Sequence, residues 1–214
     1  KRSGLSSWSN GGLAGGNSTA TTANNNWQCG FIDTDKFYLW NNDVSMNLIS
    51  TRRATDTNAW YHVVWSLDST QSTAADRAKL YVNGEQVTAF DTATYPAQDT
   101  DLHVNSTAVH RISSYAGTSN YLDGYLAEVN FIDGTALDAD SFGKTKNGIW
   151  IPKEYSGSYG TNGFHLTFKE AGDLGADSSY TTHDIFGDSS AVATYIFDGS
   201  IVDAGGNYNG TTTS

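Results

Sequence analysis

Residues 60–84, WYHVVWSLDSTQSTAADRAKLYVNG, decide the fold class of this chain. Every second residue near the start of the stretch is apolar: Tyr61, Val63, Trp65 and Leu67. Successive side chains of a β-strand point to opposite faces, so this spacing predicts a strand with these side chains on its buried face. Trp65 is therefore expected inside the protein.

A second apolar run covers residues 78–82 and stops at Asn83-Gly84. Both residue types tolerate a positive φ angle, which a two-residue type I′ hairpin turn requires at both positions. The sequence therefore predicts a tight reversal at Asn83-Gly84. The polar insert at residues 69–77 is too long for a tight turn and is expected to form a surface loop.

Further apolar runs along the chain indicate a protein with many strands. The runs at 27–33 and 36–41 are joined by Thr34-Asp35 and predict a hairpin. The run at 122–133 is apolar with few breaks, as a central strand would be. Weaker strand candidates are residues 45–54, 107–113 and 163–168.

One short helical element interrupts this pattern. Residues 136–143, ALDADSFG, predict a single helical turn near 138–142. Asp138 is the expected N-cap, because a carboxylate there can accept a hydrogen bond from a backbone N–H of the first turn.

Composition excludes several classes of function. The chain has 214 residues with 12 Lys and Arg against 23 Asp and Glu, giving a net charge of −11. We therefore expect no nucleic-acid partner and no anionic membrane partner, since both need a basic face. No apolar run approaches the ~20 residues that span a bilayer. Cys29, the single cysteine, is expected to be a buried core side chain.

The segments AWYHVVWSLDST (59–70) and AKLYVNGEQV (78–87) resemble the W-x-H-V and L-Y-V-N-G core of laminin-G-like domains. DGYLAEVNFIDGTALDADSFG (123–143) is similar to a later strand and helical turn of the same family. The resemblance implies an all-β fold, a concanavalin A-like jelly roll in which two antiparallel sheets form a sandwich. Overall likeness points to the subgroup found in structural proteins of tailed bacteriophages.

The resemblance also divides the chain. Residues 1–186 are expected to form the jelly roll, with its first strands preceding residue 1 and residues 1–4 continuing a strand. Residues 187–214 are expected to hold a linker and the opening strand, at 192–198, of a second similar module. An internal echo between residues 164–185 and 193–214 supports this division.

The expected function follows from the resemblance. It implies a non-enzymatic carbohydrate-binding or adhesion module on the virion surface or a tail fibre, outside the cell, that attaches the phage to a host surface polysaccharide. Other virion chains are expected partners, and self-association into a homo-oligomer is left open. Two alternatives stay open: a structural or decoration domain for virion or fibre assembly, and a polysaccharide-degrading enzyme.

A lectin-like site needs aromatic faces that stack on sugar rings and polar groups that bind hydroxyls. The predicted loops offer both kinds of side chain. The candidate ligand-binding residues are Trp8, Asn42, Asp43, Tyr115, Asn120 and Tyr121.

No catalytic residue is predicted. A retaining glycosidase needs two carboxyl groups about 5–5.5 Å apart, and no predicted strand carries a pair of acidic residues on one face. Glu128 stands alone and is expected to make a hydrogen bond across strands or at the rim. A His/Tyr pair of the lyase type, His110 with Tyr115 or Tyr121, remains the enzymatic alternative.

No metal site and no cofactor are predicted, although calcium stays an open option. Calcium takes six to eight oxygen ligands, and loop carboxylates are its usual protein ligands. The loop carboxylates that could serve are Asp99 with Asp101, Asp138 with Asp140, and Asp173 with Asp177.

Overall fold

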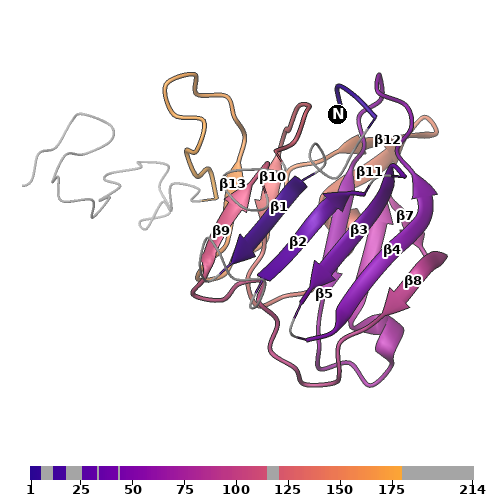
Figure 1. Cartoon of the computed structure of the whole chain (residues 1–214). Coiled ribbons are helices and arrows are strands. Elements are labelled where there is room, and N and C mark those ends of the chain that lie inside the picture. Colours follow the sequence, from indigo (N-terminus) through magenta and orange to yellow (C-terminus); the bar gives the residue numbers. More distant parts are fainter. Residues whose placement is uncertain (6–11, 18–25, 33, 43, 115–120, 180–214) are drawn as a thin grey trace, which may run out of the picture.

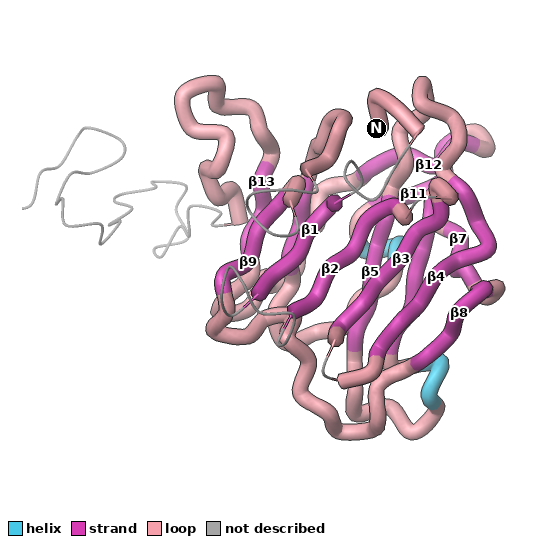
Figure 2. The backbone as a smooth tube through the Cα atoms, in the orientation of Figure 1, coloured by secondary structure: helices cyan, strands magenta, loops and turns pink. Residues whose placement is uncertain are grey.

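The computed structural model describes residues 1–5, 12–17, 26–32, 34–42, 44–114 and 121–179. Within these residues the protein is built from strands, with two single turns of 3-10 helix (Figure 2). The all-β prediction is therefore confirmed. The predicted strand at 192–198 and the segment 187–214 lie outside the described residues.

One layer is a six-stranded antiparallel sheet with the strand order β8-β4-β3-β2-β1-β9 (Figure 1). Its strands are β1 (Gly12–Asn17), β2 (Asn26–Phe31), β3 (Lys36–Asn41), β4 (Met46–Arg53), β8 (Phe90–Thr94) and β9 (Val109–Ile112). The predicted hairpin at Thr34-Asp35 is confirmed, because β2 and β3 pair from Phe31–Phe37 to Trp27–Asn41. The weak candidate at 45–54 forms the eight-residue strand β4.

The second layer begins with the three-stranded sheet β5-β6-β7, which Figure 1 shows behind the six-stranded sheet. Its strands are β5 (Val63–Leu67), β6 (Ala78–Val82) and β7 (Glu85–Val87). Two further pairs are separate: β10 (Val129–Phe131) with β13 (Phe164–Leu166), and β11 (Gly143–Lys146) with β12 (Ile149–Pro152). The sandwich therefore has one continuous sheet facing smaller hydrogen-bonded pieces.

The core lies between β2, β3 and β4 on one side and β5 and β6 on the other. Phe37, Leu80 and Val82 are completely buried in one cluster. Leu39, Met46 and Leu48 are buried in a second cluster, and Trp65 packs against both. The predicted facing of β5 is confirmed, although Trp65 is half-buried rather than fully enclosed.

The predicted turn at Asn83-Gly84 is confirmed. Asn83 has φ 52° and Gly84 has φ 84°, and the pair Val82–Glu85 closes the hairpin. Asn83 also ties the turn to the residue before β5. Its backbone N–H donates to the carbonyl of His62, and its side-chain Oδ1 accepts from the His62 backbone N–H, both at 2.8 Å.

The predicted central strand at 122–133 is wrong. Only Val129–Phe131 are extended, as β10, and within the described residues β10 pairs with β13 alone. Glu128 has φ 51°, a left-handed conformation that interrupts an extended strand. Residues 1–4, expected to continue a strand, instead make one isolated antiparallel bridge between Arg2 and Gly124.

Smaller predictions are also settled. The helical turn near 138–142 is the 3-10 turn Ala139–Ser141, with Asp138 at its N-cap. The Asp138 side chain caps no backbone N–H there and instead accepts a long 3.4 Å bond from the Ser141 hydroxyl.

The insert at 69–77 is a surface loop that contains the 3-10 turn Ala74–Asp76. Cys29 is buried, as expected, and burial raises the pKa of its thiol to about 12.

Candidate functional site

The structure does not gather the predicted sugar-binding residues into one site. Trp8, Asp43, Tyr115 and Asn120 lie outside the described residues. Asn42 begins the turn after β3, at the end of the sandwich where Asn41 pairs with Met46. Tyr121 lies near the other end, because Leu122 donates to Ser113, which follows β9.

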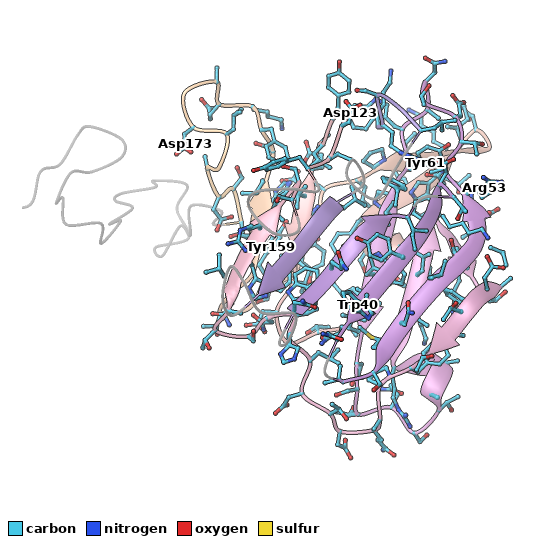
Figure 3. All side chains as sticks on the ribbon, in the orientation of Figure 1. Trp40, Arg53, Tyr61, Asp123, Tyr159 and Asp173 are labelled. Atoms are coloured by element: carbon cyan, nitrogen blue, oxygen red, sulfur yellow. The ribbon has the colours of Figure 1, made fainter. Side chains whose placement is uncertain are left out.

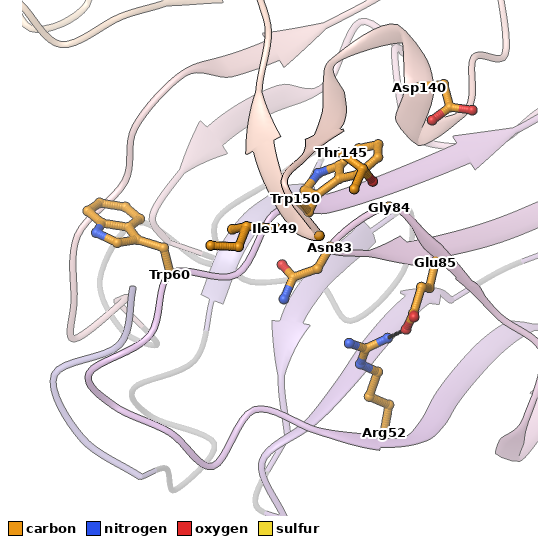
Figure 4. Close-up of a pocket in the computed structure, with 10 residues that line it drawn as sticks. Arg52, Trp60, Asn83, Gly84, Glu85, Asp140, Thr145, Ile149 and Trp150 are labelled. Carbon is orange, nitrogen blue, oxygen red and sulfur yellow. Dashed lines mark hydrogen bonds and ion pairs between the residues drawn. The ribbon is translucent and has the colours of Figure 1, made fainter.

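That other end, here called the hairpin end, contains the Thr34-Asp35 and Asn83-Gly84 turns, Arg52 and Arg53. The pairing of Lys36 with Arg53 and the ion pair between Arg52 and Glu85 place these segments together. A groove with a volume of about 620 Å³ opens at this end (Figure 4). It is lined by Arg52, Trp60, Asn83, Gly84, Glu85, Asp140, Thr145, Gly148, Ile149 and Trp150.

Trp150 of β12 forms the floor of the groove because two glycines let it approach the backbone closely. A Cβ atom on Gly84 would lie 2.3 Å from Trp150 Cε3, and one on Gly143 would lie 2.4 Å from Trp150 Cζ2. The ring of His62 packs on the same indole, with centroids 5.8 Å apart. The fold motif and the β11–β12 hairpin therefore build this floor together.

Two large apolar side chains project from the floor into solvent. Trp60 is 53% exposed and Ile149 is 67% exposed. Figure 4 shows Ile149 between Trp60 and the Asn83 side chain. Exposed apolar side chains beside a groove are typical of a ligand-binding surface.

The polar groups of the groove are fixed in place. Arg52 Nη1 donates to Glu85 Oε2 at 3.0 Å across the mouth (Figure 4). Because the Asn83 Oδ1 already accepts from His62, the amide NH₂ is the part of Asn83 left to donate to a ligand. The groove lining holds one cation, Arg52, and two carboxylates, Glu85 and Asp140, so the groove does not favour an anionic ligand.

The family of the chain can now be stated. A laminin-G model described as the concanavalin A-like lectin/glucanases superfamily matches residues 4–141, more than half of the chain. The chain belongs to this superfamily. No curated protein and no solved structure gives a match.

Since the name of the superfamily covers both lectins and glucanases, the carboxylates of this member matter. Glu128 lies outside the groove and bonds across strands to β13, as predicted: Oε2 is 2.8 Å from His165 Nε2. Lys169 Nζ lies 3.9 Å from Glu128 Oε1, and the Tyr159 ring stacks on His165. Burial of Tyr159 raises the pKa of its hydroxyl above the usual value.

The His/Tyr alternative finds little support in the described residues. His110 Nε2 accepts from the backbone N–H of Asn105, and Nδ1 lies 2.7 Å from the Ala108 carbonyl. His110 pairs with Gly16, toward the end opposite Tyr121. The pairing with Tyr115 lies outside the described residues. Burial lowers the pKa of His62, whose ring packs under the groove floor rather than facing a ligand.

The candidate calcium carboxylates do not cluster within the described residues, where no group of three or more His, Cys, Asp or Glu side chains could hold a metal ion. Asp177 instead caps a turn, because its Oδ1 accepts from the backbone N–H groups of His165 and Ser179. Asp173 likewise accepts from Gly175.

The same described residues include no helix with the length and apolar character needed to cross a bilayer.

The groove residues were not predicted as a site. Ile149 is far from Arg52 and Trp60 in the sequence and meets them only because β12 converges with β4 and the residues before β5. One local signal was present for Trp60. The alternation that puts Tyr61 inside puts Trp60 on the outward face, where a tryptophan is unusual without a covering element.

Proposed function

We propose that this chain is a non-enzymatic carbohydrate-binding or adhesion module whose ligand lies in the groove at the hairpin end. The observation that carries the proposal is the exposure of Trp60 and Ile149 beside the fixed Asn83 and Arg52–Glu85 polar groups. Sugar rings present one apolar face and a fringe of hydroxyls. A site with an aromatic face and a few placed donors and acceptors matches that chemistry.

The proposed ligand in its finer form is a host surface polysaccharide, bound by a module on a phage virion or tail fibre outside the cell. This part of the proposal goes beyond the superfamily and rests on the resemblance of the sequence motifs to those of tailed-phage structural proteins. Neighbouring virion chains are its proposed partners. The excess of acidic residues, with net charge −11, favours glycan over nucleic acid or an anionic membrane.

The test is an array of immobilised bacterial capsular and O-chain polysaccharides together with neutral plant and fungal glucans. Wild-type protein is expected to bind a subset of these glycans. Trp60→Ala is expected to lose most of that signal. Leu174→Ala removes an equally exposed apolar side chain from another loop and is expected to bind like the wild type.

Two outcomes would contradict the proposal. Folded wild-type protein that binds no glycan above background would leave the structural or decoration role as the better account. Release of reducing or unsaturated ends from a bound polysaccharide, lost in Glu128→Gln, would show an enzyme instead of a binding module. Circular dichroism and thermal melting of each variant would confirm that loss of binding is not loss of folding.

A further inference from the structure

We propose that the groove is one part of a longer binding track, and that its ligand is a linear chain of uncharged sugars running past Ile149 and Trp60 toward Tyr125. This inference rests on the proposed carbohydrate-binding function and specifies the ligand of the same site. It predicts recognition of internal segments of a polymer rather than of a single terminal sugar.

The first support is the concentration of exposed apolar side chains at the hairpin end. Tyr121 is 52% exposed and Tyr125 is 60% exposed, comparable with Trp60 and Ile149. Figure 3 labels Asp123, between the two tyrosines, and Tyr61, beside Trp60, toward the same end of the sandwich. By contrast, the exposed Val109 lies at the opposite end, where β9 pairs with Asn17 of β1.

The second support is a set of hydrogen bonds that joins the backbone segments carrying Tyr125 and Trp60. The backbone N–H of Tyr125 donates to the Lys1 carbonyl at 2.7 Å, and Ser3 donates to Asp123 at 2.9 Å. Arg2 Nη1 in turn donates to the carbonyl of Ala54 at 2.9 Å. Residues 1–3 therefore connect the segment that carries Tyr125 to the loop that leads from Ala54 to Trp60.

The close packing of the two segments is expected to restrain this surface. A Cβ atom on Gly124 would lie 2.3 Å from the Lys1 carbonyl oxygen, so the segment around Gly124 packs directly on residue 1. Arg2 is 1% exposed and holds residues 1–3 to the sandwich. Aromatic platforms on a rigid surface bind a ligand with little loss of conformational entropy.

Charge selects the class of sugar. Arg52 at the groove is outnumbered by Glu85 and Asp140, and the surface toward Tyr125 adds the carboxylates of Asp56 and Asp123 against the two amino groups of Lys1. Carboxylates outnumber cations along the track, so a polysaccharide with carboxylate or sulfate groups would meet a net like charge. An uncharged chain would instead place successive ring faces on the aromatic side chains and direct its hydroxyls to Asn83, Arg52 and Glu85.

The test uses the neutral polysaccharide with the strongest array signal, partly hydrolysed and separated by size. Calorimetry would measure dissociation constants for each size fraction with wild type, Tyr125→Ala, Tyr125→Phe and the control Leu174→Ala. Affinity is expected to rise about tenfold from short to long fragments. Tyr125→Ala is expected to weaken the affinity for long fragments by about fivefold, the scale of one aromatic contact. The affinity for short fragments is expected to stay unchanged.

Tyr125→Phe keeps the ring and is expected to bind like the wild type. Affinity that does not depend on length, or long fragments unaffected by Tyr125→Ala, would overturn the track while leaving a carbohydrate-binding groove. A preference for an acidic polysaccharide would overturn the assignment of an uncharged ligand. Absence of binding to every glycan would overturn the proposed function itself.

Discussion

Two arginine–carboxylate pairs at the hairpin end have nearly the same geometry and opposite surroundings. Arg2 and Asp35 are 2.9 Å apart with side chains 1% and 9% exposed. Arg52 and Glu85 are 3.0 Å apart with side chains 35% and 78% exposed. The distance between the charges is therefore not what distinguishes the two pairs.

Burial gives the two pairs different roles. Arg2 also donates to Ala54 and lies over the Phe31 ring, 4.6 Å from its centroid, so it can serve only as an anchor for the first residues. The Arg52–Glu85 pair faces solvent, where the net stability of an ion pair is small and its donors and acceptors remain available to a ligand. The buried pair shapes the surface, and the exposed pair can contact what binds there.

The largest expected effect comes from breaking the buried pair. Arg2→Ala removes the closer partner of the buried Asp35 carboxylate and leaves Arg53, whose Nη2 lies 3.9 Å from Asp35 Oδ2. Removing one partner of a buried pair typically costs about 3–5 kcal/mol. Chemical denaturation would measure the loss in free energy of unfolding. The double variant Arg2→Ala with Asp35→Asn is expected to recover part of it, because the buried carboxylate charge is then removed together with Arg2. A loss below about 1 kcal/mol would mean that this pair behaves like an exposed one.

The groove floor offers a second comparison through two glycines with positive φ. Gly84 has φ 84° and Gly148 has φ 78°, but a Cβ atom would meet Trp150 at Gly84 and nothing within 4 Å at Gly148. Both alanine variants are expected to cost about 1 kcal/mol from backbone strain. Gly84→Ala is expected to cost a further 1–3 kcal/mol, roughly, from crowding. Equal losses in melting experiments would show that Trp150 does not pack on the turn.

The parts of the fold that were predicted depend on residues close together in sequence. The turn at Asn83-Gly84 needs only two residues tolerant of positive φ, and the facing of β5 needs only alternation over Tyr61–Leu67. The error at 122–133 has the same origin. Its apolar residues match the pattern of a strand. The backbone of Glu128, however, is left-handed, and its side chain contacts His165, a residue distant in the sequence. The local sequence specifies neither feature.

The candidate site could not be predicted in the same way. Trp60 was interpreted as part of the fold motif, and Ile149 and Arg52 carried no local signal. Their meeting depends on Trp150 packing against Gly84 and on the pairing of Arg52 with Glu85 across two sheets. Exposure is a property of the folded surface, so alternation could suggest an outward Trp60 without identifying what surrounds it.

A smaller effect is expected from pH. Burial lowers the pKa of His62 below its usual 6.5, so the unfolded chain takes up a proton there more readily than the folded one. Above about pH 6.5 His62 is neutral in both states and does not reduce the free energy of unfolding. As the pH drops from there toward the pKa of the folded state, the free energy of unfolding falls. Denaturation curves between about pH 5 and 8 are expected to show a shallower pH dependence for His62→Gln. An unchanged slope would mean that His62 is not desolvated.

The smallest effect on stability is expected from breaking the exposed pair. Arg52→Ala should change the free energy of unfolding by about 0–1 kcal/mol, because water and salt already screen this pair. Its effect on glycan binding should be larger than its effect on folding. Arg52→Ala that destabilises the protein as much as Arg2→Ala would remove the distinction between the two pairs.

The central claim is that ligand binds at the hairpin end, and nuclear magnetic resonance tests it most directly. The size-separated glycan fragments would be titrated into protein labelled uniformly with nitrogen-15 and also at isoleucine methyls, so that backbone amides, tryptophan indoles and isoleucine methyls are all observed. The account predicts saturable shift changes at Ile149 and Trp60, with Asn42 at the opposite end unaffected. Shift changes that gather around Asn42 while Ile149 and Trp60 stay constant would contradict it.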